Sequence, residues 1–261
     1  MPTYTSLSPA ARFRSRRSQP AAGGRCLAAA VVAWLTVALL PICSAGAQSV
    51  RPATAEARVS EPTSYDELWR AAMVAVDDGE FEPNANARAT VFAKATAYAR
   101  RSVALNPGDA EGHFHLARAL GRTALSLGPR DRVKYGIEVR EHALQALRVA
   151  PRHAGALHVM GVWNAEIMRL NGFTRAVAKT FLGGQIFNTA SWPEAVRYME
   201  LAVQVEPDRL VHRLDMARIY RDLGRADDAR AAYRAALNCA NMDANDPRYR
   251  QQAGDELRRM R

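Results

Sequence analysis

Small, apolar and aromatic side chains recur at fixed intervals between Leu210 and Ala236, and these intervals constrain the fold more than any other feature of the chain. Counted from Leu210 as position 1, the residues at positions 7, 8, 11, 15, 20, 24 and 27 are Met216, Ala217, Tyr220, Gly224, Ala229, Tyr233 and Ala236. Small side chains at positions 8, 20 and 27 let two antiparallel helices approach closely, and the aromatic side chains fill the space between them. Gly224 suits the left-handed residue that ends a helix, and Asp227 suits the first turn of the next helix. The segment is therefore predicted to be a helix pair.

Prolines close three earlier helices in the same way. Pro107, Pro151 and Pro207 each occupy position 32 of such a unit. In the units that follow Pro107 and Pro151, position 8 is again a small residue, Ala117 and Gly161 respectively. The set matches the tetratricopeptide repeat, in which helix pairs stack side by side into a superhelix.

From Tyr65 onward apolar residues recur every three or four positions, and no segment alternates as a strand would. The spacing of the prolines is irregular, because Pro107 to Pro151 is 44 residues and Pro151 to Pro207 is 56, against a standard period of about 34. We therefore predict an all-α, tetratricopeptide-like α-α superhelix over residues 64–261, built of degenerate repeats with two insertions.

The two insertions are expected to differ. The first, around Leu125–Tyr135, is predicted to lengthen a helix pair. The second, around Met168–Ser191, is long enough for an added helix bounded by glycines. Within it, the segment Phe173–Phe181 has apolar side chains on one face and Arg175 and Lys179 on another, so it either packs onto the repeats or lies on an anionic membrane surface.

Residues 1–47 have the three parts of a secretory signal peptide. Arginines precede an apolar run from Leu27 to Leu40, and the small residues Ser44–Ala47 follow, so cleavage is predicted before Gln48. The run is shorter than the roughly 20 residues that span a bilayer, but an uncleaved inner-membrane anchor remains the alternative. Residues 48–63 have no apolar period and are predicted to be a flexible leader. The Ala-rich, Arg-over-Lys composition is typical of a high-GC bacterium, which predicts export to the periplasm.

The net charge of +10 is divided between these regions. Five arginines and no acid lie in residues 1–47, which leaves an excess of five for the remainder. There the basic residues alternate with acids at helical spacing, as in the pair Arg218 and Asp222. Because a nucleic-acid-binding protein would show a basic stripe, no nucleic-acid partner is predicted.

Four stretches stand out in order along the chain: Lys134–His142, Leu157–Trp163 with Glu166, Phe181–Gly183 and Trp192–Ala195. Together they resemble the regulator of microtubule dynamics family, and the resemblance extends from about Tyr65 to Arg258. It implies a tetratricopeptide-like helical fold with the same two interruptions and a protein-binding role. We do not extend tubulin binding to this chain, because a protein exported from a bacterium meets no microtubules.

In tetratricopeptide arrays the first helix of each pair lines the inner groove, at about positions 2, 5, 9 and 12. The predicted peptide groove therefore consists of Glu111, Phe114, Arg118, His158, Val162, Leu214, Arg218 and Arg221. Guanidinium groups pair bidentately with carboxylates, so an extended peptide that bears a carboxylate could bind there. The same side chains could instead be ordinary solvated helix residues, and the added helix could cover the groove.

No pattern in the chain proposes an enzyme. His113 and His115 are two residues apart, so on a helix their side chains point about 200° apart and cannot chelate one ion. A phosphate loop would need glycine directly before Lys179, where Ala178 stands. No Gly-x-Ser-x-Gly motif is present either. We therefore predict no catalytic residue, no cofactor and no metal.

Two functions follow from these features. The first is an exported, non-enzymatic scaffold that binds a protein or peptide in the periplasm. The second is a membrane-associated tether, held by an uncleaved N-terminus or by the amphipathic insertion. A helical enzyme or metal-binding protein is a third, weaker hypothesis.

Overall fold

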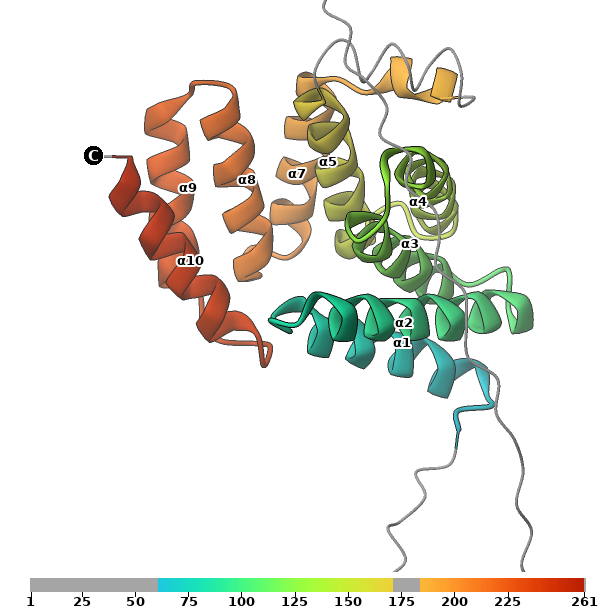
Figure 1. Ribbon diagram of the computed structural model, residues 1–261. Helices are drawn as coiled ribbons and strands as arrows, with labels where there is room; N and C mark the ends of the chain where they lie inside the picture. The colour runs from blue at the N-terminus through green and yellow to red at the C-terminus, as the bar shows by residue number, and fades with distance from the viewer. Residues whose placement is uncertain (1–60, 171–183, 261) are drawn as a thin grey trace, which may run out of the picture. The chain divides into compact units, whose positions relative to one another are not determined.

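The computed structural model describes residues 61–170 and 184–260, and all regular structure in these ranges is helical (Figure 1). The α-helices are α1 (Tyr65–Glu80), α2 (Ala85–Leu105), α3 (Ala110–Leu125), α4 (Pro129–Val149), α5 (Ala154–Arg169), α7 (Trp192–Val205), α8 (Leu210–Asp222), α9 (Ala226–Asn238) and α10 (Asp246–Arg259). A short 3-10 helix, η1 (Gly184–Thr189), precedes α7. The predicted all-α, tetratricopeptide-like fold is confirmed.

The helices pack as successive pairs. Helix α1 packs on α2, α3 on α4, α5 on α7, and α8 on α9 (Figure 1). The pairs then stack through contacts of α2 with α3, α4 with α5, and α7 with α8. Helix α10 follows the last pair and packs against both α8 and α9. This is the arrangement of a repeat array whose last pair is covered by an additional helix.

The residues that identified the last repeat lie where close packing requires them. Ala217, Ala229 and Ala236 are each fully buried, and Tyr233 fills the space between α8 and α9 with no exposed surface. Gly224 has a φ of +72°, the left-handed conformation that ends a helix without steric cost only in glycine. The prediction of a helix pair here is confirmed.

The prolines also end helices as predicted, since α2, α4 and α7 each stop two residues before one of them. Helix α4 is 21 residues long, so the first insertion does lengthen its helix pair. Of the second insertion, residues 171–183 lie outside the described ranges, and with them the predicted amphipathic segment. The described part contributes η1, whose Phe187 is buried against Trp163 of α5.

The two ends of the array touch. Asn245, just before α10, donates a hydrogen bond from Nδ2 to the backbone carbonyl of Asp77 in α1, at 2.8 Å. Next to it, the rings of Phe81 and Tyr249 meet edge to face with centroids 5.1 Å apart. These contacts fix the start of α10 against the end of α1.

The N-terminal expectations fall on residues that the structure does not describe. The signal peptide (1–47), the leader (48–63, except its last three residues) and the cleavage site before Gln48 all stay predictions. The helical domain begins in the structure at Tyr65, where Ser64 and Glu67 form a capping box. Across residues 61–170 and 184–260, no helix combines the length and the apolar character that crossing a bilayer requires.

Candidate binding site

The eight predicted groove residues lie on α3, α5 and α8, the first helices of three successive pairs. Seven of them are at least partly exposed. Leu214 is fully buried in the core formed by α8, α9 and α10, so its assignment to the groove is wrong. The reason is α10, because this helix covers a face of α8 that the repeat numbering leaves open.

The groove residues of α3 are held by neighbouring helices. Glu111 accepts a hydrogen bond from Nε2 of His153 at 3.2 Å, and Arg118 donates a hydrogen bond to Asp77 of α1 at 2.6 Å. The ring of Phe114 packs beside the His153 ring and lies so close to Gly155 that a Cβ there would be 2.4 Å from the ring. Phe114 therefore joins α3 to α5, and its ring is not free to anchor a peptide.

His158 of α5 belongs to a polar chain that runs between helices. Its Nδ1 atom is 2.8 Å from Nδ1 of His212, and its Nε2 atom is 3.2 Å from Asp215. Asp215 in turn binds Arg218 at 2.9 Å. Burial would raise the pKa of Asp215, but the hydrogen bond from His158 and the charge of Arg218 hold it well below its usual range. Sequence reasoning placed His158 and Arg218 in one groove, and the structure joins them through Asp215.

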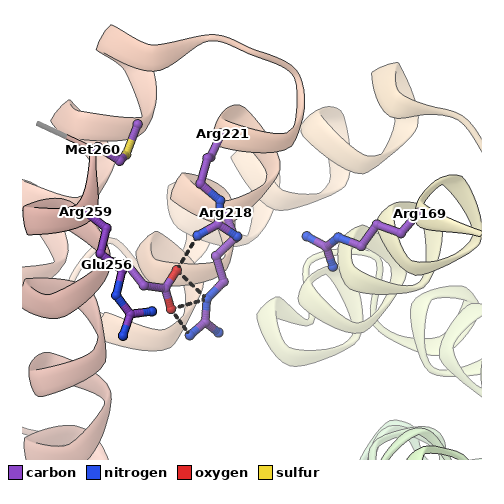
Figure 2. Close-up of a pocket in the computed structure, with 6 residues that line it drawn as sticks. All are labelled: Arg169, Arg218, Arg221, Glu256, Arg259 and Met260. Carbon is purple, nitrogen blue, oxygen red and sulfur yellow. Dashed lines mark hydrogen bonds and ion pairs between the residues drawn. The ribbon is translucent and has the colours of Figure 1, made fainter.

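Arg218 and Arg221 meet in a pocket of about 520 Å³ between α5, α8 and α10 (Figure 2). Its lining consists of Arg169, Arg218, Arg221, Glu256, Arg259 and Met260. The lining therefore holds four arginines and one carboxylate. The pocket brings two of the predicted groove residues together with four residues that the groove prediction did not include.

Glu256 is bound by three side chains at once, and Figure 2 draws two of them, Arg218 and Arg221. Arg218 donates from Nε and Nη2 to Oε1 at 3.0 and 2.6 Å, while Arg221 donates from Nη1 to Oε2 at 2.7 Å. The Tyr233 hydroxyl completes the set at 2.7 Å from Oε2. Burial would raise the pKa of Glu256, but these bonds lower it overall, so the carboxylate is ionised. The carboxylate that the two arginines were predicted to bind is thus already present within the chain.

The other two arginines differ in their surroundings. Arg169 donates to Asp222 at 2.7 Å and to Glu166 at 2.5 Å. Arg259 is exposed and makes no hydrogen bond or ion pair with any residue that the structure describes. The backbone of the next residue is held, because Arg230 of α9 donates to the backbone carbonyl of Met260 at 3.0 Å.

Arg169, Glu256, Arg259 and Met260 were missed because three of them lie beyond the last recognisable repeat. A signal for α10 does exist in the sequence. Tyr249, Ala253 and Leu257 are spaced four residues apart, which predicts one apolar face of a helix. That face packs on the last pair and turns Glu256 toward α8.

Comparison with known proteins identifies relatives of this chain. The family described as Regulator of microtubule dynamics protein 1-3 matches residues 46–261. Regulator of microtubule dynamics protein 1 of Bos taurus is 24% identical over 142 residues, which is 54% of this chain and 44% of the relative. The Homo sapiens protein of the same name is 23% identical over 141 residues, again 54% and 44%. The chain thus spans less than half the length of these relatives.

Among solved structures, the chain is similar to a thermophilic TPR protein of Thermus thermophilus. The two are 22% identical, the match covers 72% of this chain and 90% of the other, and the TM-score is 0.46.

Proposed function

The chain belongs to the regulator of microtubule dynamics protein 1-3 family, and from this premise we propose that it is a non-enzymatic helical scaffold that binds another protein or a peptide. The pocket between α5, α8 and α10 supports the proposal most directly. It lies where the first helices of two successive pairs meet α10, and its lining is dominated by arginine, a residue enriched in the contact surfaces of protein complexes.

The predicted groove is kept as part of this proposal in a reduced form. Leu214 is removed from it, and Phe114 and Arg118 serve contacts between helices. Glu111 and Arg221 still expose 44% and 41% of their side chains, so both remain available to a partner. The partner would therefore contact exposed parts of α3 and α8 together with the pocket.

The proposed location is the periplasm, after cleavage before Gln48. Cell fractionation with sequencing of the mature N-terminus tests it. We expect a soluble chain that begins at Gln48. A full-length chain in the membrane fraction would overturn the location and support the tether instead.

Site-specific photo-crosslinking in intact cells tests the binding function. A benzophenone amino acid at Met260, which lines the pocket, should form an adduct with one protein, whereas the same group at Val149, an exposed residue at the end of α4, should not. The captured protein is then purified and titrated against the mature chain by calorimetry, where we expect one binding site. If no protein is captured at Met260, or if the captured protein does not bind when pure, the function is refuted.

A further inference from the structure

The pocket between α5, α8 and α10 is rich in hydrogen-bond donors that have no acceptor among the residues the structure describes. A guanidinium carries five N–H groups. Arg259 uses none of them on the described residues, and Arg221 uses only Nη1, on Glu256 and Tyr233. The Nε atom of Arg221 lies 3.7 Å from Asp222, which is too long for a hydrogen bond. Within the described part of the chain, N–H donors on α8 and α10 therefore remain unused at this pocket.

Acceptors, by contrast, are exhausted. Among the residues that the structure describes, Glu256 is the only carboxylate that lines the pocket, and Arg218, Arg221 and Tyr233 occupy both of its oxygens. A ligand that binds in the pocket must therefore supply acceptors, and the guanidinium of Arg259, which has no carboxylate partner among the described residues, favours an anion.

The charge behind the lining limits how much negative charge the anion should carry. The lining has four arginines and one glutamate, which is an excess of three positive charges. Asp215 pairs with Arg218, both Asp222 and Glu166 pair with Arg169, and Glu256 pairs with Arg221, so among the described residues Arg259 is the one lining arginine without a carboxylate partner. A single negative charge suits this one guanidinium better than the nearly double charge of a phosphate group.

The size and the lining of the pocket favour a carboxylate that is part of a peptide over a free carboxylate ion. A volume of about 520 Å³ exceeds the needs of a free carboxylate ion, and Met260 adds an apolar wall beside Arg259. A thioether adapts to irregular apolar groups, so an aliphatic side chain next to the carboxylate would pack there.

We propose that this pocket binds a carboxylate of the partner peptide, next to Glu256, with Arg259 as its principal contact. This inference rests on the proposed function and specifies the chemistry of the partner. The carboxylate comes either from an acidic side chain or from the C-terminus of the partner, and both supply the same planar, singly charged group.

Calorimetric titration of the purified mature chain tests the proposal, with three short peptides and inorganic phosphate as probes. The first peptide, acetyl-Gly-Leu-Glu-Leu-Gly-amide, carries a carboxylate only on its side chain. The second, acetyl-Gly-Gly-Leu-Leu, carries one only at its C-terminus. The third, acetyl-Gly-Leu-Gln-Leu-Gly-amide, carries none. We expect the wild type to bind at least one carboxylate peptide about 10-fold more tightly than the glutamine peptide, the equivalent of about 1.4 kcal/mol.

The variants Arg259→Ala and Arg258→Ala provide a matched pair on α10. Arg258 is also exposed, but it does not line the pocket and it pairs with Asp255. Arg259→Ala should lose the 10-fold preference, and Arg258→Ala should keep it. Circular dichroism should show the same helix content for all three proteins, since Arg259 holds no described partner.

Four results would overturn the proposal: no measurable binding of either carboxylate peptide, equal binding of the glutamine peptide, equal effects of the two variants, or tighter binding of phosphate than of both peptides. These outcomes are separable from those of the photo-crosslinking experiment. If a protein is captured at Met260 but Arg259→Ala leaves its affinity unchanged, the function stands and the carboxylate site is wrong. If the peptides bind as expected and no protein is captured, the site stands and the scaffold function is wrong.

Discussion

The Nδ1 atoms of His158 on α5 and His212 on α8 lie 2.8 Å apart. Such a bond joins two chemically identical nitrogens, so it needs one protonated ring nitrogen and one bare one. His113 on α3 and His142 on α4 repeat the arrangement with Nδ1 atoms 2.9 Å apart. Each of these two contacts between helices therefore requires that one of its two Nδ1 atoms carries no proton.

We predict from this that the protein loses stability as the pH falls below about 6.5, the ordinary pKa of histidine. Burial lowers the pKa of His212 to about 4 and that of His115 to about 3, and burial also lowers the pKa of His142. Because these folded-state values lie below the unfolded one, the unfolded chain binds more protons in acid. The contribution of these histidines to the free energy of unfolding is complete above pH 6.5. Below that pH it declines by up to about 1.4 kcal/mol per histidine and pH unit.

Urea denaturation at pH 7.5, 6.0 and 5.0 measures this loss. His212→Gln should flatten the dependence, because it removes one group that the unfolded state protonates. His153→Asn is the control, since asparagine can keep the N-cap bond that His153 accepts from Ala156. A free energy of unfolding that is constant from pH 7.5 to 5.0 would contradict the prediction.

Gly155→Ala should destabilise the contact between α3 and α5. A Cβ at this position would lie 2.4 Å from Cζ of Phe114, and the Phe114 ring has the His153 ring beside it at a centroid distance of 4.6 Å. Forcing a methyl group into such a contact costs about 1–3 kcal/mol. Gly128→Ala is the matched control, because nothing lies within 4 Å of the added carbon. Urea denaturation of both variants measures the difference, and equal stability would show that the ring moves without cost.

How much of this fold could be predicted depends on the range of the interactions concerned. Ala217, Ala229 and Ala236 were predictable because close helix packing excludes larger side chains at fixed intervals along one unit. The burial of Leu214 was not, because it results from α10, which lies outside the repeat pattern. Spacing within a repeat carries no information about a helix that follows the last one.

The candidate site illustrates the same limit. The sequence numbering placed Arg218 and Arg221 on one helix face, and both do line the pocket. Their carboxylate, Glu256, is 38 residues beyond Arg218, and no spacing rule connects residues at that distance on different helices. Charge counting alone therefore predicted an external carboxylate where the chain supplies one of its own.

Tyr65→Phe should loosen the start of the array. The Tyr65 hydroxyl donates to Asp109 at 2.5 Å and accepts from the backbone N–H of Gly112 at 3.1 Å, so it joins α1 to the N-terminus of α3. Removing it leaves the N–H of Gly112 without this acceptor in a partly buried site and takes one of the two hydrogen bonds from Oδ1 of Asp109, which still accepts from the N–H of Glu111, at a cost of about 1–3 kcal/mol. Tyr135→Phe is the control, because the Tyr135 hydroxyl makes no hydrogen bond with a described residue. Thermal unfolding should separate the two variants, and equal midpoints would refute the role of Tyr65.

Glu256→Gln should release α10 from α8. The amide keeps the shape of the carboxylate but removes its charge, and one of its two positions becomes an N–H donor that faces the donors of Arg218 or Arg221. Because the Glu256 side chain is only 16% exposed, we expect a loss of about 1–3 kcal/mol in the free energy of unfolding. Asp255→Asn is the control on the same helix, since its pair with Arg258 is exposed and should contribute less than about 1 kcal/mol.

Limited digestion with trypsin locates the effect of Glu256→Gln within the molecule. Arg250 of α10 is tied to the backbone carbonyl of Cys239 at 2.6 Å, which protects the adjacent peptide bond while the helix is docked. When α10 detaches, the peptide bond after Arg250 becomes accessible to trypsin. Cleavage there should therefore be faster in Glu256→Gln than in Asp255→Asn or the wild type. If Glu256→Gln unfolds at a lower urea concentration without faster cleavage there, the lost stability belongs to the whole array, and Glu256 does not hold α10 in place individually.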